Sequence, residues 1–264
     1  MAQKKVWLTW LPQGEGVPGP DATVSALSKV GLSVAGSHWV DDLEKVAWAE
    51  LGGLLLDSEK ADIWLIAGRK VDFQSSRIRY GLSLVTAMVS EDRKVPITYI
   101  CVGLDFQPEA EAMPRLLRQF HFLNGAESTW PAKVVAFAFG KISERPGAEY
   151  YFHAIAHPIL GQWFEVGPHA DEWKGVMFGV DGNGKITHHA VGPRGHLPEK
   201  SVLEYPTQGI EATLGDNEFI AWSVQNTLGP DDSYFIRVDG FPNSVIIGKH
   251  PISDDAEVYH IELI

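Results

Sequence analysis

The chain has 264 residues, of which 45% are hydrophobic and 21% charged, and its formal net charge is -12. This composition is that of an ordinary globular protein and excludes collagen, a coiled coil and an intrinsically disordered chain. Its single cysteine, Cys101, excludes an internal disulfide and every zinc site built from several cysteines. No apolar run reaches the roughly 18 residues of a membrane span, and the first residues resemble a strand more than a signal peptide. We therefore expect a cytoplasmic protein without a membrane contact.

Charge divides the chain into two parts. Residues 1–145 contain 16 Lys and Arg against 17 Asp and Glu, whereas residues 146–264 contain 6 against 17. The acidic second part would repel polyphosphate, which excludes it as a nucleic-acid-binding surface. The shift coincides with the Pro/Gly-containing segment 144–148, so we predict two domains, 1–145 and 146–264.

The first part alternates apolar runs of strand length with helical patterns. Strands are predicted over residues 5–11, 32–39, 61–67, 95–102 and 132–139. Helices are predicted over 22–30, from an Asp41/Glu44 capping box to Leu55, from Ser75 or Ser76 to Val89, and over 113–122. Nearly continuous apolar strands indicate a parallel sheet covered on both faces, and we expect the flavodoxin-like order 2-1-3-4-5.

The second part has short apolar runs separated by Gly, Pro, Asn and Asp turns, which is typical of an antiparallel β-sandwich or barrel. The segment 178–186 is predicted as a β-hairpin. The ten predicted strands cover residues 151–155, 162–166, 175–180, 185–191, 201–205, 211–214, 219–225, 234–238, 244–248 and 257–264. The fold class is therefore α/β followed by all-β.

A candidate ligand site lies at the predicted switch point of the parallel sheet, where the loops after the first and third strands meet. The first loop offers three glycines, which permit close approach of the backbone: Gly14, Gly16 and Gly19. The second loop offers four cations and two serines at a helix N-terminus: Arg69, Lys70, Arg77, Arg79, Ser75 and Ser76. This set suits an anionic ligand such as a nucleotide. Alternatively, the cations pair with Asp72 and with the acidic second domain.

The familiar phosphate-binding motifs are absent. No Gly-x-Gly-x-x-Gly follows the first strand, and no P-loop occurs in the chain. The third strand ends in Ala67-Gly68, which excludes the acidic residue that a response regulator carries there.

Residues 63–82 resemble the corresponding stretch of Toll/interleukin receptor-type (TIR) domains. Those domains have Ser-x-Trp-Cys-Arg-Tyr-Glu-Leu where this chain has Ser75-Ser-Arg-Ile-Arg-Tyr-Gly-Leu82. The run 95–104 followed by Pro108, and the pair Trp130-Pro131, extend the resemblance over residues 4–141. Enzymatic members cleave NAD with a glutamate in this helix, and Gly81 stands at the matching position. Arg77 replaces the tryptophan, so the resemblance implies a TIR-like domain without the usual catalytic carboxylate.

Other potential sites are less well supported. Five histidines could supply zinc ligands, but adjacent strand residues such as His188 and His189 point to opposite faces, so we expect no metal and no cofactor. These histidines are His157, His169, His188, His189 and His196. The loop at Asp181 lacks the later ligands of a calcium site and is predicted to be a turn. Cys101 lies in an apolar strand and is expected to be an inert core thiol. Three tryptophans could stack on sugars but are more typical of a core: Trp163, Trp173 and Trp222.

Two functional hypotheses follow. The first is a non-enzymatic binding or regulatory protein whose TIR-like domain binds an anionic or nucleotide-type ligand or a protein partner, with the acidic domain mediating assembly, including homo-oligomers. The alternative is an NAD or nucleotide hydrolase with a displaced catalytic acid.

Overall fold

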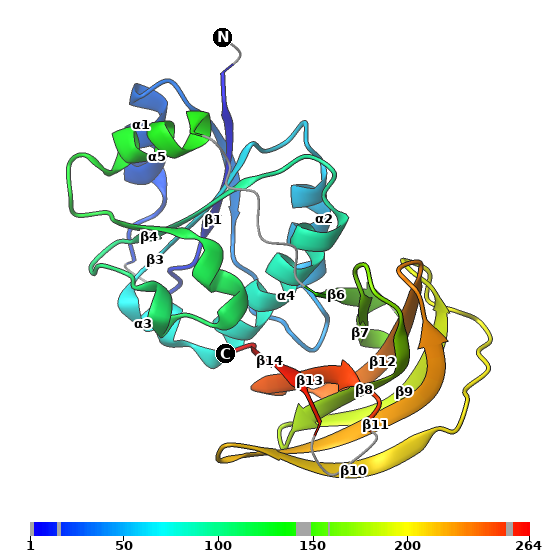
Figure 1. Cartoon of the computed structure of the whole chain (residues 1–264). Helices are drawn as coiled ribbons and strands as arrows, with labels where there is room; N and C mark the ends of the chain where they lie inside the picture. Colours follow the sequence, from blue (N-terminus) through cyan, green and yellow to red (C-terminus); the bar gives the residue numbers. More distant parts are fainter. Residues whose placement is uncertain (1–2, 15–16, 141–148, 158, 252–255) are drawn as a thin grey trace. The chain divides into compact units, whose positions relative to one another are not determined.

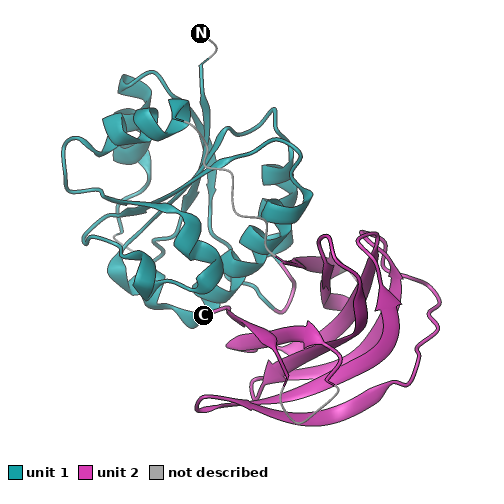
Figure 2. Ribbon diagram, in the orientation of Figure 1, with its two compact units in different colours: residues 1–43, 47–144 teal, residues 44–46, 145–264 magenta. Residues whose placement is uncertain are grey.

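The computed structural model describes residues 3–14, 17–140, 149–157, 159–251 and 256–264. The chain divides into two compact units (Figure 2). Unit 1 comprises residues 1–43 and 47–144, and unit 2 comprises residues 44–46 and 145–264. The predicted boundary after residue 145 falls in the segment 141–148, which lies outside the described residues.

Unit 1 is built on a parallel sheet of five strands in the order β2-β1-β3-β4-β5, as the sequence predicts. Strands β3 and β4 are buried along their whole length, because helices cover both faces of the sheet. The strands are β1 (Lys5–Trp10), β2 (Ser33–His38), β3 (Ile63–Gly68), β4 (Thr98–Gly103) and β5 (His121–Asn124).

Helices α1 and α5 cover one face of this sheet, and α2 and α4 cover the other (Figure 1). Alternation along β1 sends Leu8 and Trp10 into the core beneath α1 and α5, and sends Thr9 to the opposite face, where its hydroxyl accepts a hydrogen bond from Trp64. The helices are α1 (Asp21–Lys29), α2 (Trp48–Leu56), α3 (Lys70–Gln74), α4 (Ser76–Asp92) and α5 (Trp130–Phe139), and two short 3-10 turns are η1 (Ala110–Ala112) and η2 (Arg115–Gln119).

The fifth strand is not where the sequence analysis places it. Residues 132–139 belong to helix α5, and the fifth strand is His121–Asn124, within and beyond the segment predicted as a helix over 113–122. Pro131 stands in the first turn of α5, where its missing amide hydrogen costs no hydrogen bond and its fixed φ favours a helix. The apolar residues of α5 then recur at helical spacing and bury Trp130 and Val134.

The predicted helix starts are right in one case and wrong in another. Ser75 caps α4, since its hydroxyl accepts a hydrogen bond from the amide of Ile78 at 3.5 Å. The proposed capping box at Asp41 and Glu44 does not begin a helix, because α2 starts at Trp48. Cys101 is buried in β4, and burial raises the pKa of its thiol, as expected for a core residue.

Unit 2 is an antiparallel β-sandwich of two separate sheets. One sheet has the order β10-β11-β8-β13-β14 and the other β6-β7-β12-β9. They meet through ring contacts, such as Phe164 on β7 against Phe178 on β8, whose centroids are 5.5 Å apart. The strands are β6 (Tyr150–His157), β7 (Gly161–Pro168), β8 (Trp173–Asp181), β9 (Gly184–Pro193), β10 (Thr207–Leu214), β11 (Asn217–Leu228), β12 (Asp232–Gly240), β13 (Ser244–Lys249) and β14 (Val258–Glu262).

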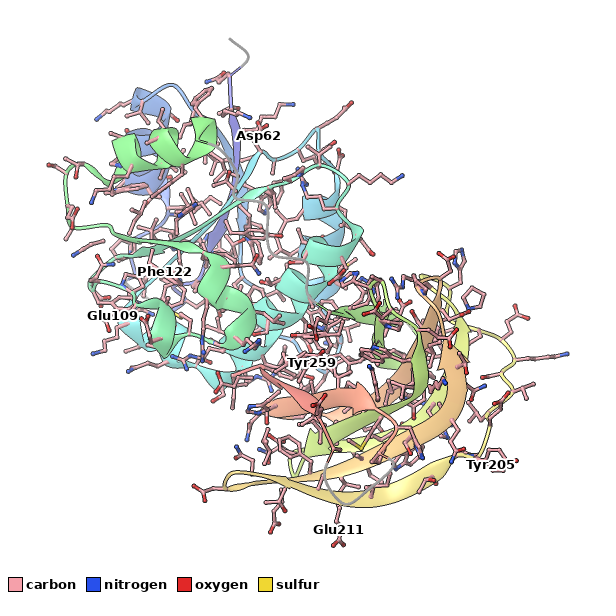
Figure 3. The ribbon with its side chains drawn as sticks, in the orientation of Figure 1. Asp62, Glu109, Phe122, Tyr205, Glu211 and Tyr259 are labelled. Atoms are coloured by element: carbon pink, nitrogen blue, oxygen red, sulfur yellow. The ribbon has the colours of Figure 1, made fainter. Side chains whose placement is uncertain are left out.

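Two details of unit 2 differ from the prediction. The segment 178–186 is not a hairpin, because β8 and β9 belong to different sheets and the turn between them passes from one sheet to the other. Asp181 fixes this turn by accepting hydrogen bonds from the amides of Asn183 and Ser244, at 3.2 and 2.9 Å. Residues 201–205 do not form a strand; Tyr205 has a positive φ and lies at the surface (Figure 3).

A carboxylate is buried inside unit 2. Glu165 on β7 is fully buried, and its Oε1 accepts a hydrogen bond of 2.7 Å from the amide of Gly195. Its Oε2 lies 3.6 Å from Nδ1 of His153, the residue opposite it on β6. The neighbouring Arg194 lies over the ring of Tyr151 at 4.3 Å. Glu165 therefore fastens the loop that follows β9 onto the sheet.

Candidate functional site

A cavity of about 370 Å³ lies at the carboxyl edge of the sheet in unit 1. This is the edge at which open α/β sheets bind ligands. Its walls come from the ends of β1, β3, β4 and β5, from the loop after β1, and from the first turns of α1 and α5. The residues that line it are Trp10, Pro12, Val17, Pro18, Gly19, Ala22, Thr23, Ala26, Arg69, Leu104, Gly125 and Trp130. We call it the switch-point cavity.

Arg69 supplies the charge of the switch-point cavity, and Asp72 holds it in place. Two guanidinium nitrogens of Arg69 donate to the Asp72 carboxylate at 3.0 and 2.8 Å, and the Arg69 amide donates to it at 2.7 Å. The hydrogen bonds to Asp72 raise the pKa of Arg69, so the guanidinium stays charged. Because a guanidinium has five N–H donors, three remain for a ligand.

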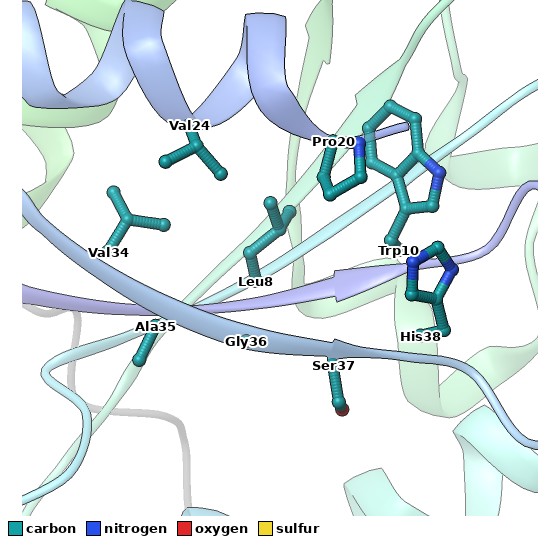
Figure 4. A pocket seen from close by; sticks show the side chains of 9 residues that line it. All are labelled: Leu8, Trp10, Pro20, Val24, Val34, Ala35, Gly36, Ser37 and His38. Carbon is teal, nitrogen blue, oxygen red and sulfur yellow. The ribbon is translucent and has the colours of Figure 1, made fainter. Parts of the chain in front are cut away.

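Trp10 contributes an apolar wall at the end of β1. Its side chain is 5% exposed, and its Nε1 is buried without a hydrogen-bond partner. A smaller neighbouring cavity of about 120 Å³ lies beside β2. In the view of its lining residues in Figure 4, the indole nitrogen of Trp10 lies on the side of the ring away from Leu8 and Val24, toward the carboxyl end of β1. That end of β1 forms the wall of the switch-point cavity.

The predicted glycine loop is only partly at the cavity. Gly19 lines it. Gly14 lies in the same loop with φ of +113°, a conformation that favours glycine. Gly16 lies outside the described residues.

The other predicted residues do not line the switch-point cavity. Ser75 and Ser76 begin α4, on the opposite face of the sheet from α1 and α5 (Figure 1). Arg77 pairs with Asp41, with Nε 3.1 Å from the carboxylate. Arg79 donates to the carbonyls of Phe73 and Ala112, and burial lowers its pKa. Lys70 begins α3, and its amide donates to Asp105 at 2.8 Å. Of the four predicted cations, Arg69 alone is among the described residues that line the switch-point cavity.

Sequence reasoning missed the apolar half of the site. Trp10 and Trp130 are 5% and 7% exposed and form two of its walls, together with the half of α1 that contains Thr23. Two signals in the sequence could have identified these residues. The alternation along β1 puts Trp10 on the face that α1 covers, and the pair Trp130-Pro131 is typical of a helix start.

Gly81, at the position of the TIR glutamate, has no room for a side chain. A Cβ there would lie 2.5 Å from the ring of Trp39 and 3.3 Å from Leu43. A carboxylate at this position would have to displace a buried tryptophan.

The described histidines of unit 2 lie in no cluster of potential metal ligands. Across the described parts of the chain, no group of three or more His, Cys, Asp or Glu side chains could hold a metal ion. The side chain of His157 is outside the described residues. His189 instead hydrogen-bonds through Nδ1 to the Tyr234 hydroxyl at 2.8 Å and packs edge-on against Trp222. Trp163 and Trp173 are buried.

Protonation of His189 should lower the free energy of unfolding in mild acid. Burial lowers the pKa of His189 below the ordinary 6.5, and the nearby His188 lowers it further. The unfolded chain therefore binds the proton more readily, so the free energy of unfolding should fall as pH drops below about 6.5. Urea unfolding of the wild type and of His189→Phe from pH 7.5 to 5 measures this effect. We expect a shallower pH dependence in the variant, and an identical slope would contradict the assignment.

No helix in the described part of the chain combines the length and hydrophobicity that crossing a bilayer requires. No family model matches the chain, and no curated protein matches it. Among solved structures, the chain is similar to translation elongation factor SelB from Methanococcus maripaludis, in complex with the GTP analogue GppNHp, with a TM-score of 0.30 and 6% sequence identity. That similarity covers 98% of this chain and 79% of SelB.

Proposed function

We propose that unit 1 binds a small anionic molecule of nucleotide type in the switch-point cavity, and that the chain is a binding or regulatory protein and not an enzyme. The observation that carries this proposal is the position of Arg69. It is the sole charged side chain among the described residues that line the switch-point cavity, which opens at the edge where α/β sheets bind ligands.

The chemistry of the lining favours binding over catalysis. Among its described residues there is no carboxylate, imidazole or thiol, so no side chain there can act as a general acid or base near neutral pH. The crowding of Gly81 by Trp39 supports the same conclusion for the TIR-like position. The proposal includes a TIR-like relationship for unit 1, a cytoplasmic setting, and a protein partner or second copy as the target of the acidic unit 2.

Substitution of Arg69 tests the proposal. Arg69→Gln keeps a donor for Asp72 and removes the charge, so the affinity for a nucleoside monophosphate should fall about 10- to 100-fold, the effect of one charge-assisted contact. Arg77→Gln is the matched control, because Arg77 pairs with Asp41 and does not line the switch-point cavity. Isothermal titration calorimetry of both variants with AMP, GMP, CMP and UMP gives the result.

Three outcomes would overturn the proposal. They are the absence of binding by the wild type, equal losses in both variants, and release of nicotinamide or free base when the protein is incubated with NAD or nucleotides. The last would establish the hydrolase alternative. Salt should weaken binding, since part of the attraction between Arg69 and an anion is electrostatic.

A further inference from the structure

We propose that two copies of the chain associate through β2, the strand at one edge of the sheet in unit 1. The two β2 strands would pair antiparallel across a two-fold axis and join the two parallel sheets into one. This proposal concerns a different surface from the switch-point cavity and does not rest on the ligand proposed there. It also differs from the contacts proposed for unit 2, because the residues that carry it all belong to unit 1.

The outer side of β2 carries backbone groups that have no partner in the described chain. β2 is last in the strand order and, among the described strands, pairs only with β1. The amides of Ser33 and Trp39 donate to carbonyls in or next to β1, so the odd-numbered residues turn their backbone groups toward β1. Because these groups alternate along a strand, the even-numbered residues turn theirs outward. The outward N–H and C=O groups belong to Val34, Gly36 and His38, and no described residue forms a hydrogen bond with them.

β2 also lacks the features that protect sheet edges from pairing with a second chain. Natural edges are short or covered, or they carry charged residues or proline. Among the other edges of the described sheets, β5 has only four residues and β6 is mostly buried, whereas β9, β10 and β14 carry Lys185, Glu211 and Glu262. β2 has six residues, five of them exposed, and none is Lys, Arg, Asp, Glu or Pro. It is therefore the described edge best suited to pairing.

The alternation of β2 fixes the register of this pairing. Antiparallel hydrogen bonds join residues that both turn their backbone groups toward the partner. To pair all three outward residues, Gly36 must lie opposite Gly36 of the second copy, and Val34 opposite His38 of the second copy. Ala35 then lies opposite Ser37 of the second copy. Figure 4 shows that the side chains of Ala35 and Ser37 leave the same side of β2, so they would meet on one face of the joined sheet.

The two ends of β2 complement each other, which favours a second copy over an unrelated strand. Lys29 lies in the last turn of α1, just before β2, and Asp42 follows β2. Antiparallel pairing about a two-fold axis brings the basic end of one copy to the acidic end of the other. The same ends carry exposed apolar side chains, Val30 at 37% and Val40 at 59%. Pairing would bring Val40 of each copy near Val30 of the other and remove apolar surface from water.

A charge exchange at Ala35 and Ser37 tests this interface in the full chain. Wild-type protein should sediment as a dimer in analytical ultracentrifugation. Ala35→Glu combined with Ser37→Glu, or Ala35→Lys combined with Ser37→Lys, sets like charges opposite each other across the axis. Each double variant should therefore dimerise about 100-fold more weakly. An equimolar mixture of the two variants should recover dimers, because each Glu then faces a Lys.

The matched control places the same charges on another edge strand. Gln208→Lys combined with Thr213→Lys adds two lysines at exposed positions of β10 and should leave the dimer intact. A wild type that stays monomeric would overturn the proposal. Double variants of β2 that dimerise like the wild type would also overturn it, as would a mixture that recovers no dimers.

A second measurement uses the wild type alone and does not depend on the variants folding. Hydrogen exchange followed by NMR should show that the amides of Gly36 and His38 gain about tenfold protection as the protein concentration rises and dimers form. The Ser37 amide, which turns toward β1, is the internal control and should change less. A dimer in which the Gly36 and His38 amides stay unprotected would overturn pairing through β2.

Discussion

Replacing Gly36 by alanine should destabilise unit 1 by about 3 kcal/mol, at the upper end of the usual cost of overpacking. A Cβ at this position would overlap the carbonyl oxygen of Leu8 and lie 2.9 Å from its carbonyl carbon, and backbone atoms of a central strand cannot rotate away. The strands β1 and β2 would have to separate where Leu8 and Gly36 are paired. Calorimetry of the full chain should show the transition of unit 1 lowered by roughly 10 °C.

Gly53→Ala is the matched control for this prediction. Gly53 lies in α2, and no atom lies within 4 Å of the position that an added Cβ would take, so alanine should stabilise the helix by about 0.5–1 kcal/mol. The same chemical change should therefore have opposite signs at the two positions. A Gly36→Ala protein that melts like the wild type would show that β2 does not approach β1 as closely as described.

Replacing Glu165 by alanine should destabilise unit 2 by about 3–5 kcal/mol, the effect of leaving a buried donor without its acceptor and a cavity in the core. The Gly195 amide would lose its acceptor, His153 would lose a carboxylate 3.6 Å away, and a cavity would remain inside the sandwich. Glu165→Gln keeps an acceptor for Gly195 and the volume of the side chain, so its loss should be about 1 kcal/mol.

Urea unfolding followed by near-UV circular dichroism measures both variants. Hydrogen exchange measures the Gly195 amide directly. This amide should lose protection in Glu165→Ala and keep most of it in Glu165→Gln. Equal destabilisation by the two substitutions would contradict the role of the carboxylate oxygen as the acceptor for Gly195.

The sequence predicts the fold of unit 1 well because its central strands β3 and β4 are buried on both faces. A run such as Ile63–Gly68 is apolar at every position and cannot be confused with an amphipathic helix. The same criterion failed at 132–139, where a buried helix and a buried strand have similar composition. The four-residue strand His121–Asn124 pairs with β4 through its backbone. Because its two end residues are polar, its apolar run is too short to be recognised as a strand from hydropathy.

The candidate site was harder to predict because it depends on which face of the sheet each side chain occupies. Arg69 and Arg77 are close in sequence, but only Arg69 remains at the switch-point cavity, because the chain between them forms α3 and starts α4. A count of cations in one loop cannot show that Asp41 or a backbone carbonyl already engages them. Arg69 and Gly19 both line this cavity, whereas its aromatic walls required the position of α5.

The strand order of unit 2 has a consequence for the time at which each part of the chain can fold during synthesis. In unit 1 each strand pairs with the next strand of the chain or the next but one, so its sheet can grow as the polypeptide emerges. In unit 2, β7 pairs with β12 and β8 pairs with β13, so each waits for tens of further residues. Until those residues are made, β7 can pair only with β6, and β8 has neither of its partners, β11 and β13. Molecular chaperones that recognise nascent hydrophobic segments should therefore associate with the second half of this polypeptide more than with the first.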